Sequence, residues 1–296
     1  MSWPGTCIRR EEPLSNHTSF RIGGPAEWFA EPSSVEELAA VIREADRLGL
    51  PISVIGGGTN TLAADRGVRG LVIHLGAAFR KLENIGAPED PVATVRCGSA
   101  VPSQRLVMTG ARQGWDLVEI LAGLPGQVGG AMVMNAQGIG RFVQGLTVIA
   151  SDGRIQSVDR NALHFGYRRS ELPSGVIVEA ILAFPRIPAE EADRNVQAIL
   201  SRRNATQDLN VPSAGCAFRN PEQGPAGKFI DDAGLKGSRI GDAQVSLRHA
   251  NFIVNMGQAS ADDVLSLMEY VQGRIWRRFG VALEPEVRLL GESWAI

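Results

Sequence analysis

The chain has 296 residues, 44% of them apolar and 21% charged, and a formal net charge of -2 at pH 7. This composition is typical of a globular protein and gives no electrostatic sign of a nucleic-acid or membrane partner. No apolar run reaches the roughly 18 residues of a membrane span, and the first residues lack a signal-peptide pattern, so we expect a cytoplasmic protein of two or three lobes. Cys7, Cys97 and Cys216 are too widely spaced for a disulfide framework or a zinc site, so we expect reduced thiols and no metal.

The first predicted elements are a helix and a strand that lead into a glycine-rich loop. Ser34 and Glu37 have the spacing of a capping box, and apolar residues at helical spacing follow until Gly49. Residues 52–55 predict a strand, which enters the loop Ile55-Gly56-Gly57-Gly58-Thr59-Asn60. Further strands are predicted at 70–75 and 92–96.

A second glycine-rich loop follows a predicted helix at 102–112, which Gly114 ends. This loop is Ala122-Gly123-Leu124-Pro125-Gly126-Gln127-Val128-Gly129-Gly130, and it continues as an apolar segment to Gly140. Glycine removes the Cβ that keeps a backbone away from phosphate, and successive free N–H groups form an anion-binding concavity. Either loop alone is equally well explained as an ordinary turn, but the two together favour a dinucleotide cradle.

Neither loop matches a common nucleotide motif. The first does not fit G-x-G-x-x-G at the start of a helix, and neither ends in the G-K-[ST] of a P-loop. A Rossmann or Walker site is therefore a weak interpretation.

The remaining predicted elements are a hairpin, a strand, two helices and a last strand. Residues 146–150 and 154–158 flank Ser151-Asp152-Gly153, which is a hairpin signal. Ser260 and Asp263 predict a capped helix whose apolar stripe ends at Gly280. The other elements are a strand at 175–184, a polar helix at 188–206 and a strand at 282–290.

Several motifs in one order resemble the MurB-type UDP-N-acetylenolpyruvoylglucosamine reductases, a family of bacterial flavoenzymes. They are residues 16–24, the loop Gly56 to Asn60, the segment Leu124 to Gly140, residues 165–170, residues 212–221, residues 226–237 and residues 283–287. The resemblance covers most of the chain. It implies an α+β fold, with a two-subdomain FAD-binding module of the vanillyl-alcohol-oxidase/PCMH type and a C-terminal α+β substrate-binding lobe.

The division that goes with this fold is 1–78 for FAD-binding subdomain 1, 79–195 for FAD-binding subdomain 2 and 196–296 for the substrate-binding domain. Phe184 and Pro212 are separated by a short stretch of sequence, and in this respect the chain is similar to the shorter branch of the family. By the resemblance, FAD is bound noncovalently, NADPH is the hydride donor, and the substrate is an enolpyruvyl nucleotide sugar of peptidoglycan precursor synthesis. No obligatory protein partner is expected.

The resemblance also implies roles for individual residues. The catalytic set is Arg168, Cys216 and Glu286, and the substrate-binding set is Tyr167, Asn220 and Lys228. The cofactor-binding set is Ile55, Gly56, Gly57, Gly58, Thr59, Asn60, Leu124, Pro125, Gly126, Val128, Gly129, Gly130 and Asn135. Outside the motif, a surface arginine is the better explanation of Arg168, and the alternative for Glu286 is a solvent-facing strand residue. Lys228 is equally well explained as a solvated lysine.

The three catalytic residues suit the chemistry. A guanidinium is a permanently charged fork for a carboxylate, which fits Arg168. An ionised Glu286 beside the substrate carboxylate would repel the charge that develops there, so we expect it to be protonated or to share a proton. The usual family residue at 216 is serine, and an ordinary thiol is a stronger acid than a hydroxyl, so Cys216 retains the proton-donor role.

Two alternatives stay open at this point. The first is another FAD-dependent oxidoreductase of the same superfamily, or a catalytically weakened paralogue, because several motif positions depart from the family pattern. The second is a nucleotide-binding protein without catalysis. A yellow protein that NADPH bleaches would exclude the second.

Overall fold

The computed structural model describes residue 3, residues 7–206 and residues 211–291. The chain folds as two compact units, each built from three stretches. Unit 1 consists of Met1–Arg9, Phe29–Gly57 and Gly70–Arg203, and unit 2 consists of Arg10–Trp28, Gly58–Arg69 and Asn204–Ile296. The predicted three-part division, with boundaries after residues 78 and 195, stays a prediction.

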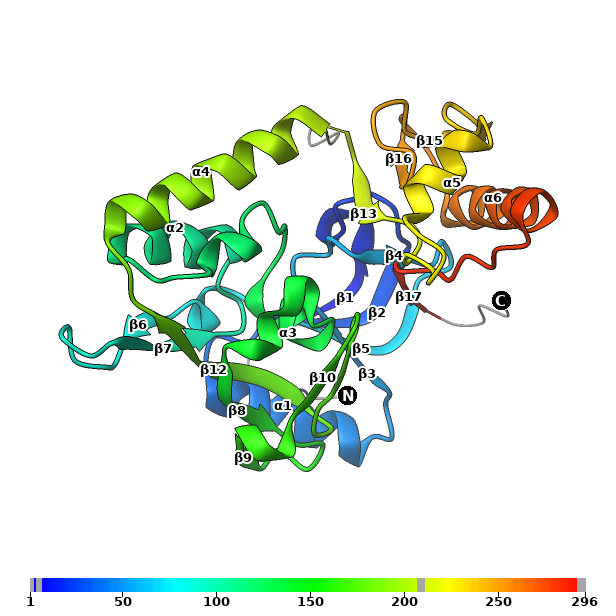
Figure 1. Cartoon of the computed structure of the whole chain (residues 1–296). Helices are drawn as coiled ribbons and strands as arrows, with labels where there is room; N and C mark the ends of the chain where they lie inside the picture. The colour runs from blue at the N-terminus through cyan, green and yellow to red at the C-terminus, as the bar shows by residue number, and fades with distance from the viewer. Residues whose placement is uncertain (1–2, 4–6, 207–210, 292–296) are drawn as a thin grey trace. The chain divides into compact units, whose positions relative to one another are not determined.

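Helices and strands are mixed along the whole chain, as Figure 1 shows. The α-helices are α1 (Val35–Arg47), α2 (Ser103–Gln113), α3 (Val128–Val133), α4 (Ala189–Thr206), α5 (Ala226–Asp232) and α6 (Ala261–Phe279). Short 3₁₀ helices are η1 (Leu14–His17), η2 (Ala77–Phe79), η3 (Val118–Leu121), η4 (Ala136–Arg141) and η5 (Arg160–Ala162).

The strands form small sheets. Their bounds are β1 (Ile8–Pro13), β2 (Pro25–Ala30), β3 (Ile52–Ile55), β4 (Thr61–Ala63), β5 (Val68–His74), β6 (Leu82–Asn84), β7 (Val92–Gly98), β8 (Val143–Ile149), β9 (Ile155–Asp159), β10 (His164–Gly166), β11 (Arg169–Glu171), β12 (Val176–Pro185), β13 (Ser213–Cys216), β14 (Arg239–Ile240), β15 (Ala243–Val245), β16 (Phe252–Asn255) and β17 (Arg288–Leu290). The strand orders are β1-β2-β5-β3, β6-β7-β12-β8-β9, β10-β11, β13-β16-β15-β14 and β17-β4. β3 pairs in parallel with β5, and the five-stranded sheet is antiparallel throughout.

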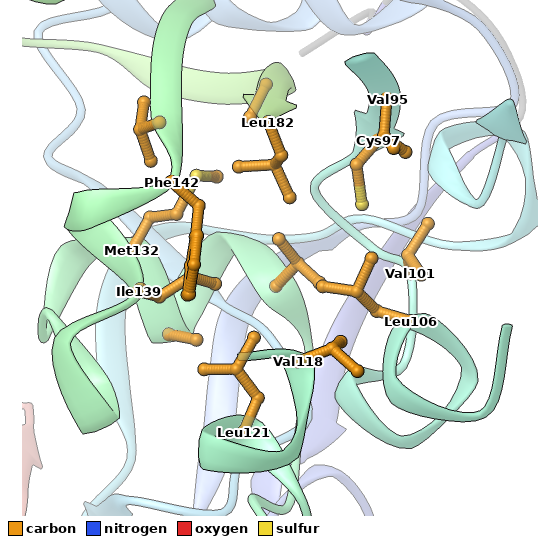
Figure 2. Packing of buried hydrophobic residues seen from close by; sticks show 14 of the residues in the cluster. Val95, Cys97, Val101, Leu106, Val118, Leu121, Met132, Ile139, Phe142 and Leu182 are labelled. Carbon is orange, nitrogen blue, oxygen red and sulfur yellow. The ribbon is translucent and has the colours of Figure 1, made fainter. Parts of the chain in front are cut away.

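Unit 1 has its core between the five-stranded sheet and the helical segment that follows β7 (Figure 2). The β7 residues Val95 and Cys97 are fully buried, as is Leu106 on α2. Trp115 stacks on Phe184 with ring centroids 5.3 Å apart. Burying one large apolar side chain stabilises the fold by about 1.5–3 kcal/mol, so this cluster holds α2 and η3 against the sheet.

The predicted helix ends are mostly confirmed. Gly114 ends α2 with φ +68°, a left-handed conformation that glycine adopts without strain. At the start of α1, Ser34 accepts a hydrogen bond from the N–H of Glu37, as expected. The reciprocal half of the predicted box is wrong, because the Glu37 carboxylate accepts its bond from the N–H of Ser33 instead.

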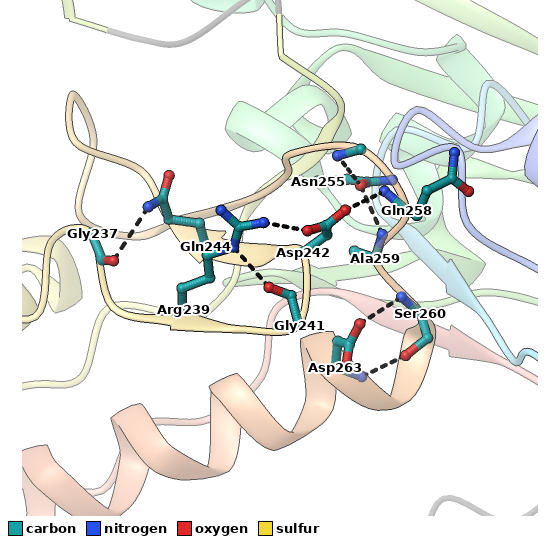
Figure 3. Close-up of polar contacts among 11 residues, drawn as sticks. Gly237, Arg239, Gly241, Asp242, Gln244, Asn255, Gln258, Ala259, Ser260 and Asp263 are labelled. Atoms are coloured by element: carbon teal, nitrogen blue, oxygen red, sulfur yellow. Dashed lines mark hydrogen bonds and ion pairs between the residues drawn. The ribbon is translucent and has the colours of Figure 1, made fainter.

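The last long helix, α6, belongs to unit 2 and matches its prediction closely (Figure 3). Ser260 accepts from the N–H of Asp263 and Asp263 accepts from the N–H of Ser260, which completes the capping box. Gly280 ends the helix in the left-handed conformation. The predicted stripe is buried at Val264, Leu267, Met268, Val271 and Ile275, whereas Phe279 is only partly buried.

Two predictions about elements differ from the structure. The segment after Gln127 was expected to continue as a loop, but Val128–Val133 forms the one-and-a-half-turn helix α3. The last strand was expected over 282–290, but only Arg288–Leu290 pairs as a strand, with a single bridge between Phe218 and Pro285 upstream. The short strand β17 pairs in parallel with β4, which lies more than 200 positions earlier in the chain.

Candidate functional site

The two glycine-rich loops approach each other closely within unit 1. A Cβ added to Gly57 would lie 2.9 Å from the Cα of Gly126, which is nearer than real Cβ atoms come. A Cβ on Gly56 would lie 3.3 Å from Oε1 of Gln127. Ile55, at the end of β3, is buried and fixes where the first loop begins. The first loop therefore needs glycine at 57 to run past the second.

The backbone of the second loop is more fully bonded than its glycine-rich sequence predicts. The N–H of Val128 donates to the carbonyl of Val101 at 2.9 Å, and the N–H of Gly129 donates to the carbonyl of Ser99 at 2.8 Å. These N–H groups pair with the residues that follow β7, so the expectation of a continuous run of free donors is wrong at these two positions. Leu124 is half-buried, Pro125 is exposed and Gly130 is exposed.

Two buried hydroxyls beside this loop belong to none of the sequence motifs. Ser99 and Ser103 are 4% and 2% exposed, and their Oγ atoms have no hydrogen-bond partner within the described part of the chain. Ser103 donates its backbone N–H to the carbonyl of Gly126 at 2.9 Å. A Cβ on Gly129 would lie 2.8 Å from the Cβ of Ser99. Buried polar groups are normally satisfied, so these hydroxyls fit a polar ligand at the second loop.

Residues 58–60 of the first loop belong to unit 2. Gly58 has φ +61°, and a Cβ there would lie 2.0 Å from the carbonyl oxygen of His17, so only glycine fits. Thr59 is half-buried. The side-chain amide of Asn60 donates to the carbonyl of Glu286 at 3.2 Å.

Unit 2 also brings the segments of Cys216 and Glu286 side by side. The N–H of Glu286 donates to the carbonyl of Ala217 at 2.8 Å, directly after Cys216 at the end of β13. The buried Asn251 side chain holds the same segment, because it accepts from the N–H of Phe218 at 3.0 Å and donates to its carbonyl at 2.7 Å. Cys216 and Glu286 are both half-buried.

The predicted substrate-binding residues of unit 2 have partners within the protein. Asn220 accepts a hydrogen bond from the N–H of Ala226 at 3.0 Å and so supports the start of α5. Lys228, on the exposed side of α5, forms an ion pair with Asp232 at 2.6 Å. A diphosphate at Lys228 would have to compete with that carboxylate.

Arg168 and Tyr167 form the turn of a short hairpin in unit 1. Strands β10 and β11 pair antiparallel, with Gly166 opposite Arg169. Arg168 has φ +54°, and its guanidinium carbon lies 5.8 Å from the centroid of the exposed Tyr167 ring. Asn135 stands just after α3 in the same unit and also has a positive φ, +42°.

In the described residues, no three His, Cys, Asp or Glu side chains gather as metal ligands. Nor does any described helix have both the length and the apolar character needed to cross a membrane.

Comparison with known proteins gives two family matches. Residues 26–159 match the FAD binding domain, and residues 207–290 match the C-terminal domain of UDP-N-acetylenolpyruvoylglucosamine reductase. The first match includes both glycine-rich loops, and the second includes Cys216 and Glu286.

Relatives align over nearly the whole chain. UDP-N-acetylenolpyruvoylglucosamine reductase 2 of Symbiobacterium thermophilum is 41% identical over 292 residues, which covers 97% of this chain and 93% of that protein. The reductase of Synechococcus elongatus is 41% identical over 96% of this chain and 95% of its own length. The crystal structure of MurB from Thermus caldophilus superposes with a TM-score of 0.79 at 35% identity, over 96% of this chain and 99% of that one.

These matches confirm the predicted fold class as an α+β protein with an FAD-binding module and a C-terminal lobe of its own. The residues of the second loop fit such a cofactor, because glycines allow close approach and the two buried hydroxyls beside it have no hydrogen-bond partner among the described residues. The chain therefore belongs to the UDP-N-acetylenolpyruvoylglucosamine reductase family and is an FAD-dependent oxidoreductase.

Proposed function

We propose that this chain reduces the enolpyruvyl ether of UDP-N-acetylglucosamine-enolpyruvate to UDP-N-acetylmuramate, with NADPH as donor, in peptidoglycan precursor synthesis. The observation that carries the proposal is the match of about 40% identity to reductases of that name over nearly the whole chain. The chemistry that bound FAD supplies is the transfer of a hydride, taken from NADPH, to the outer carbon of the ether.

Arg168 is proposed to orient the substrate carboxylate. Its planar, permanently charged guanidinium matches a carboxylate in a two-pronged contact. Reduction places negative charge on the carbon beside that carboxylate, and a preorganised cation that meets such charge is typically worth about 3–4 kcal/mol in the transition state.

Cys216 is proposed to deliver the proton to that carbon. It lies half-buried at the end of β13, and the bonds of Asn251 to Phe218 hold its segment in place. Glu286, tied to the same segment through Ala217, is proposed to be protonated in the complex. A neutral carboxyl there donates a hydrogen bond to the substrate carboxylate, whereas an ionised one would repel it.

The FAD is proposed to bind noncovalently along the glycine-rich loops. The proposed contacts are Ile55, Gly56, Gly57, Gly58, Thr59, Asn60, Leu124, Pro125, Gly126, Val128, Gly129, Gly130 and Asn135. Ser99 and Ser103 join this set, because their buried hydroxyls have no hydrogen-bond partner in the part of the chain that the structure describes.

The nucleotide sugar is proposed to contact Tyr167, Asn220 and Lys228. Lys228 takes this role by exchanging Asp232 for the diphosphate, which is feasible because the ion pair is exposed and therefore weak. A thiol proton donor and a reduced nicotinamide both suit a reducing compartment, so we propose the cytoplasm as the location.

The test separates the two halves of the reaction. The protein with FAD is reduced anaerobically by NADPH, the enolpyruvyl nucleotide sugar is added, and the return of the oxidised flavin absorbance is followed. Cys216→Ala is expected to leave the reduction by NADPH unchanged and to slow the return by about 10²-fold or more, because the proton donor is lost.

Cys216→Ser is the matched control and is expected to retain most of the rate, because a hydroxyl still donates a proton. A wild-type flavin that NADPH reduces but the substrate does not reoxidise would instead favour the alternative of another FAD-dependent oxidoreductase of the same superfamily. If the flavin of Cys216→Ala is reoxidised at the wild-type rate, the thiol has no part in the mechanism and the substrate assignment remains intact.

A further inference from the structure

The hairpin that carries Arg168 is too small to fix its own position. β10 and β11 have three residues each and form a two-stranded sheet of their own. A hairpin of this size is at best marginally stable in water, so its placement depends on what it is attached to. Its strands contact η4 and α3 of the same unit (Figure 1).

The turn itself also needs external support. Gly166 and Arg169 are the last paired residues, so Tyr167 and Arg168 alone make the turn. Arg168 takes up φ +54°, a region that disfavours a side chain with a Cβ. Such a backbone conformation persists where several surrounding contacts hold it in place, and it is common at functional sites.

Asn135 supplies one attachment through both ends of its side-chain amide. Its Nδ2 donates to the carbonyl of Gly166 at 2.8 Å, and its Oδ1 accepts from the N–H of Gly140 at 2.9 Å. The amide therefore links the segment after α3 to the residue that begins the turn. Asn135 itself sits at φ +42° and ψ +44°, which asparagine tolerates better than most residues.

Two further contacts hold the same hairpin. On the other strand, the Ser170 hydroxyl donates to the carbonyl of Val133, the last residue of α3, at 2.7 Å. The Phe165 ring packs on Gly140, where a Cβ would lie 2.2 Å from Cγ of the ring. The hairpin is thus attached at both strands to one short segment, residues 133–140.

We propose that Asn135 is a positioning residue for Arg168, and that its amide sets where the Tyr167–Arg168 turn presents the guanidinium. The inference rests on the carboxylate-orienting role that the proposed function gives to Arg168. Ser170 supports the same turn from the second strand. Asn135 thereby acts through the hairpin, in addition to any contact of its own with the cofactor.

Two substitutions separate the bonds of Asn135. Asn135→Gly keeps the left-handed backbone and removes both side-chain bonds. Asn135→Asp keeps the acceptor for the Gly140 N–H but sets a carboxylate oxygen against the carbonyl of Gly166. Asn161→Gly, on the exposed η5 of the same unit, is the control for adding a glycine.

Because Asn135 is also a proposed FAD contact, both variants are saturated with FAD and fully reduced by NADPH before the substrate is added, so that a change in FAD affinity is measured separately from reoxidation. Reoxidation by the enolpyruvyl substrate is expected to slow by about 10- to 100-fold, which is the usual effect of misplacing a catalytic group by about 1 Å. Ser170→Ala is expected to slow it less. In the apoprotein, hydrogen exchange of the Gly140 amide is expected to speed up in Asn135→Gly and to stay slow in Asn135→Asp.

A double-mutant cycle with Arg168→Ala decides whether the effect passes through the guanidinium. If it does, Asn135→Gly adds nothing to the loss already caused by Arg168→Ala. Fully additive losses, or loss of FAD binding in both Asn135 variants, would overturn the inference while leaving the proposed function standing. If the substrate reoxidises the flavin of Arg168→Ala at the wild-type rate, both the proposed role of Arg168 and this inference are overturned.

Discussion

The cysteines show how differently one residue type is placed in this protein. Cys97 is fully buried in β7, whereas Cys7 is only half-buried. Burial raises the pKa of Cys97 to about 12, and burial together with the hydrogen bond and charge of Glu37 raises the pKa of Cys7 to about 12. Both thiols therefore stay protonated at neutral pH and are poor nucleophiles.

The raised pKa of Cys97 predicts a specific loss of stability at alkaline pH. The unfolded chain releases this proton near the ordinary value of 9.0, and the folded chain near 12. Above pH 9 the folded state therefore binds more protons, so the free energy of unfolding falls by up to about 1.4 kcal/mol per pH unit from this residue. Cys97→Ala removes that contribution and leaves a small cavity.

Urea unfolding of wild type and Cys97→Ala at pH 8, 9.5 and 10.5 measures the effect. The variant is expected to be the less stable protein at pH 8, and the difference is expected to shrink as the pH rises. A difference that stays constant over this range would show that the Cys97 proton is not retained in the folded state.

At the scale of elements, local signals predicted the structure well and long-range pairing did not. The ends of α2 and α6 were predicted because a cap and a helical stripe lie within one stretch of sequence. The strands β4 and β17 were missed or misplaced because each is three residues long and, among the described residues, pairs only with the other. α3 was missed because glycines at 129 and 130 are typical of a loop.

The capping box of α6 gives a test at this scale. Ser260→Ala removes the acceptor for the Asp263 N–H and is expected to lower the free energy of unfolding by about 1 kcal/mol. Ser266→Ala, at an exposed position of the same helix, is the matched control and is expected to change stability little or to raise it slightly. Chemical denaturation of the three proteins measures this. Equal stability of the two variants would mean that the box contributes nothing.

At the scale of the whole molecule, chain order conceals which residues are neighbours. The motifs identified Asn60 and Glu286 as site residues, but only the fold places the Asn60 amide on the Glu286 carbonyl. Ser99 and Ser103 are part of no motif, because what marks them as site residues is their burial beside the second glycine-rich loop, which only the fold shows. The type of site was thus predictable from glycines and motif order, whereas its supporting contacts were not.

Each unit is built from three separate stretches of the chain, and this also decides which pieces of the chain can fold alone. The core of unit 2 includes three buried residues from outside the predicted substrate-binding domain, namely Phe20, Ile22 and Leu62. Burying each stabilises the unit by about 1.5–3 kcal/mol, and their sum is comparable to the whole stability of a small domain. The N–H of Ala261, at the start of α6, also donates to the Asp65 carboxylate at 2.9 Å.

We therefore expect residues 196–296 expressed alone to lack a cooperative unfolding transition, because β17 loses its partner β4 and the core loses those three side chains. Near-ultraviolet circular dichroism and limited proteolysis measure this. A control chain that joins 10–28, 58–69 and 204–291 through flexible linkers restores the missing residues and is expected to unfold cooperatively. Cooperative unfolding of the short fragment would instead support a domain boundary near residue 196, since the earlier segments would then be dispensable.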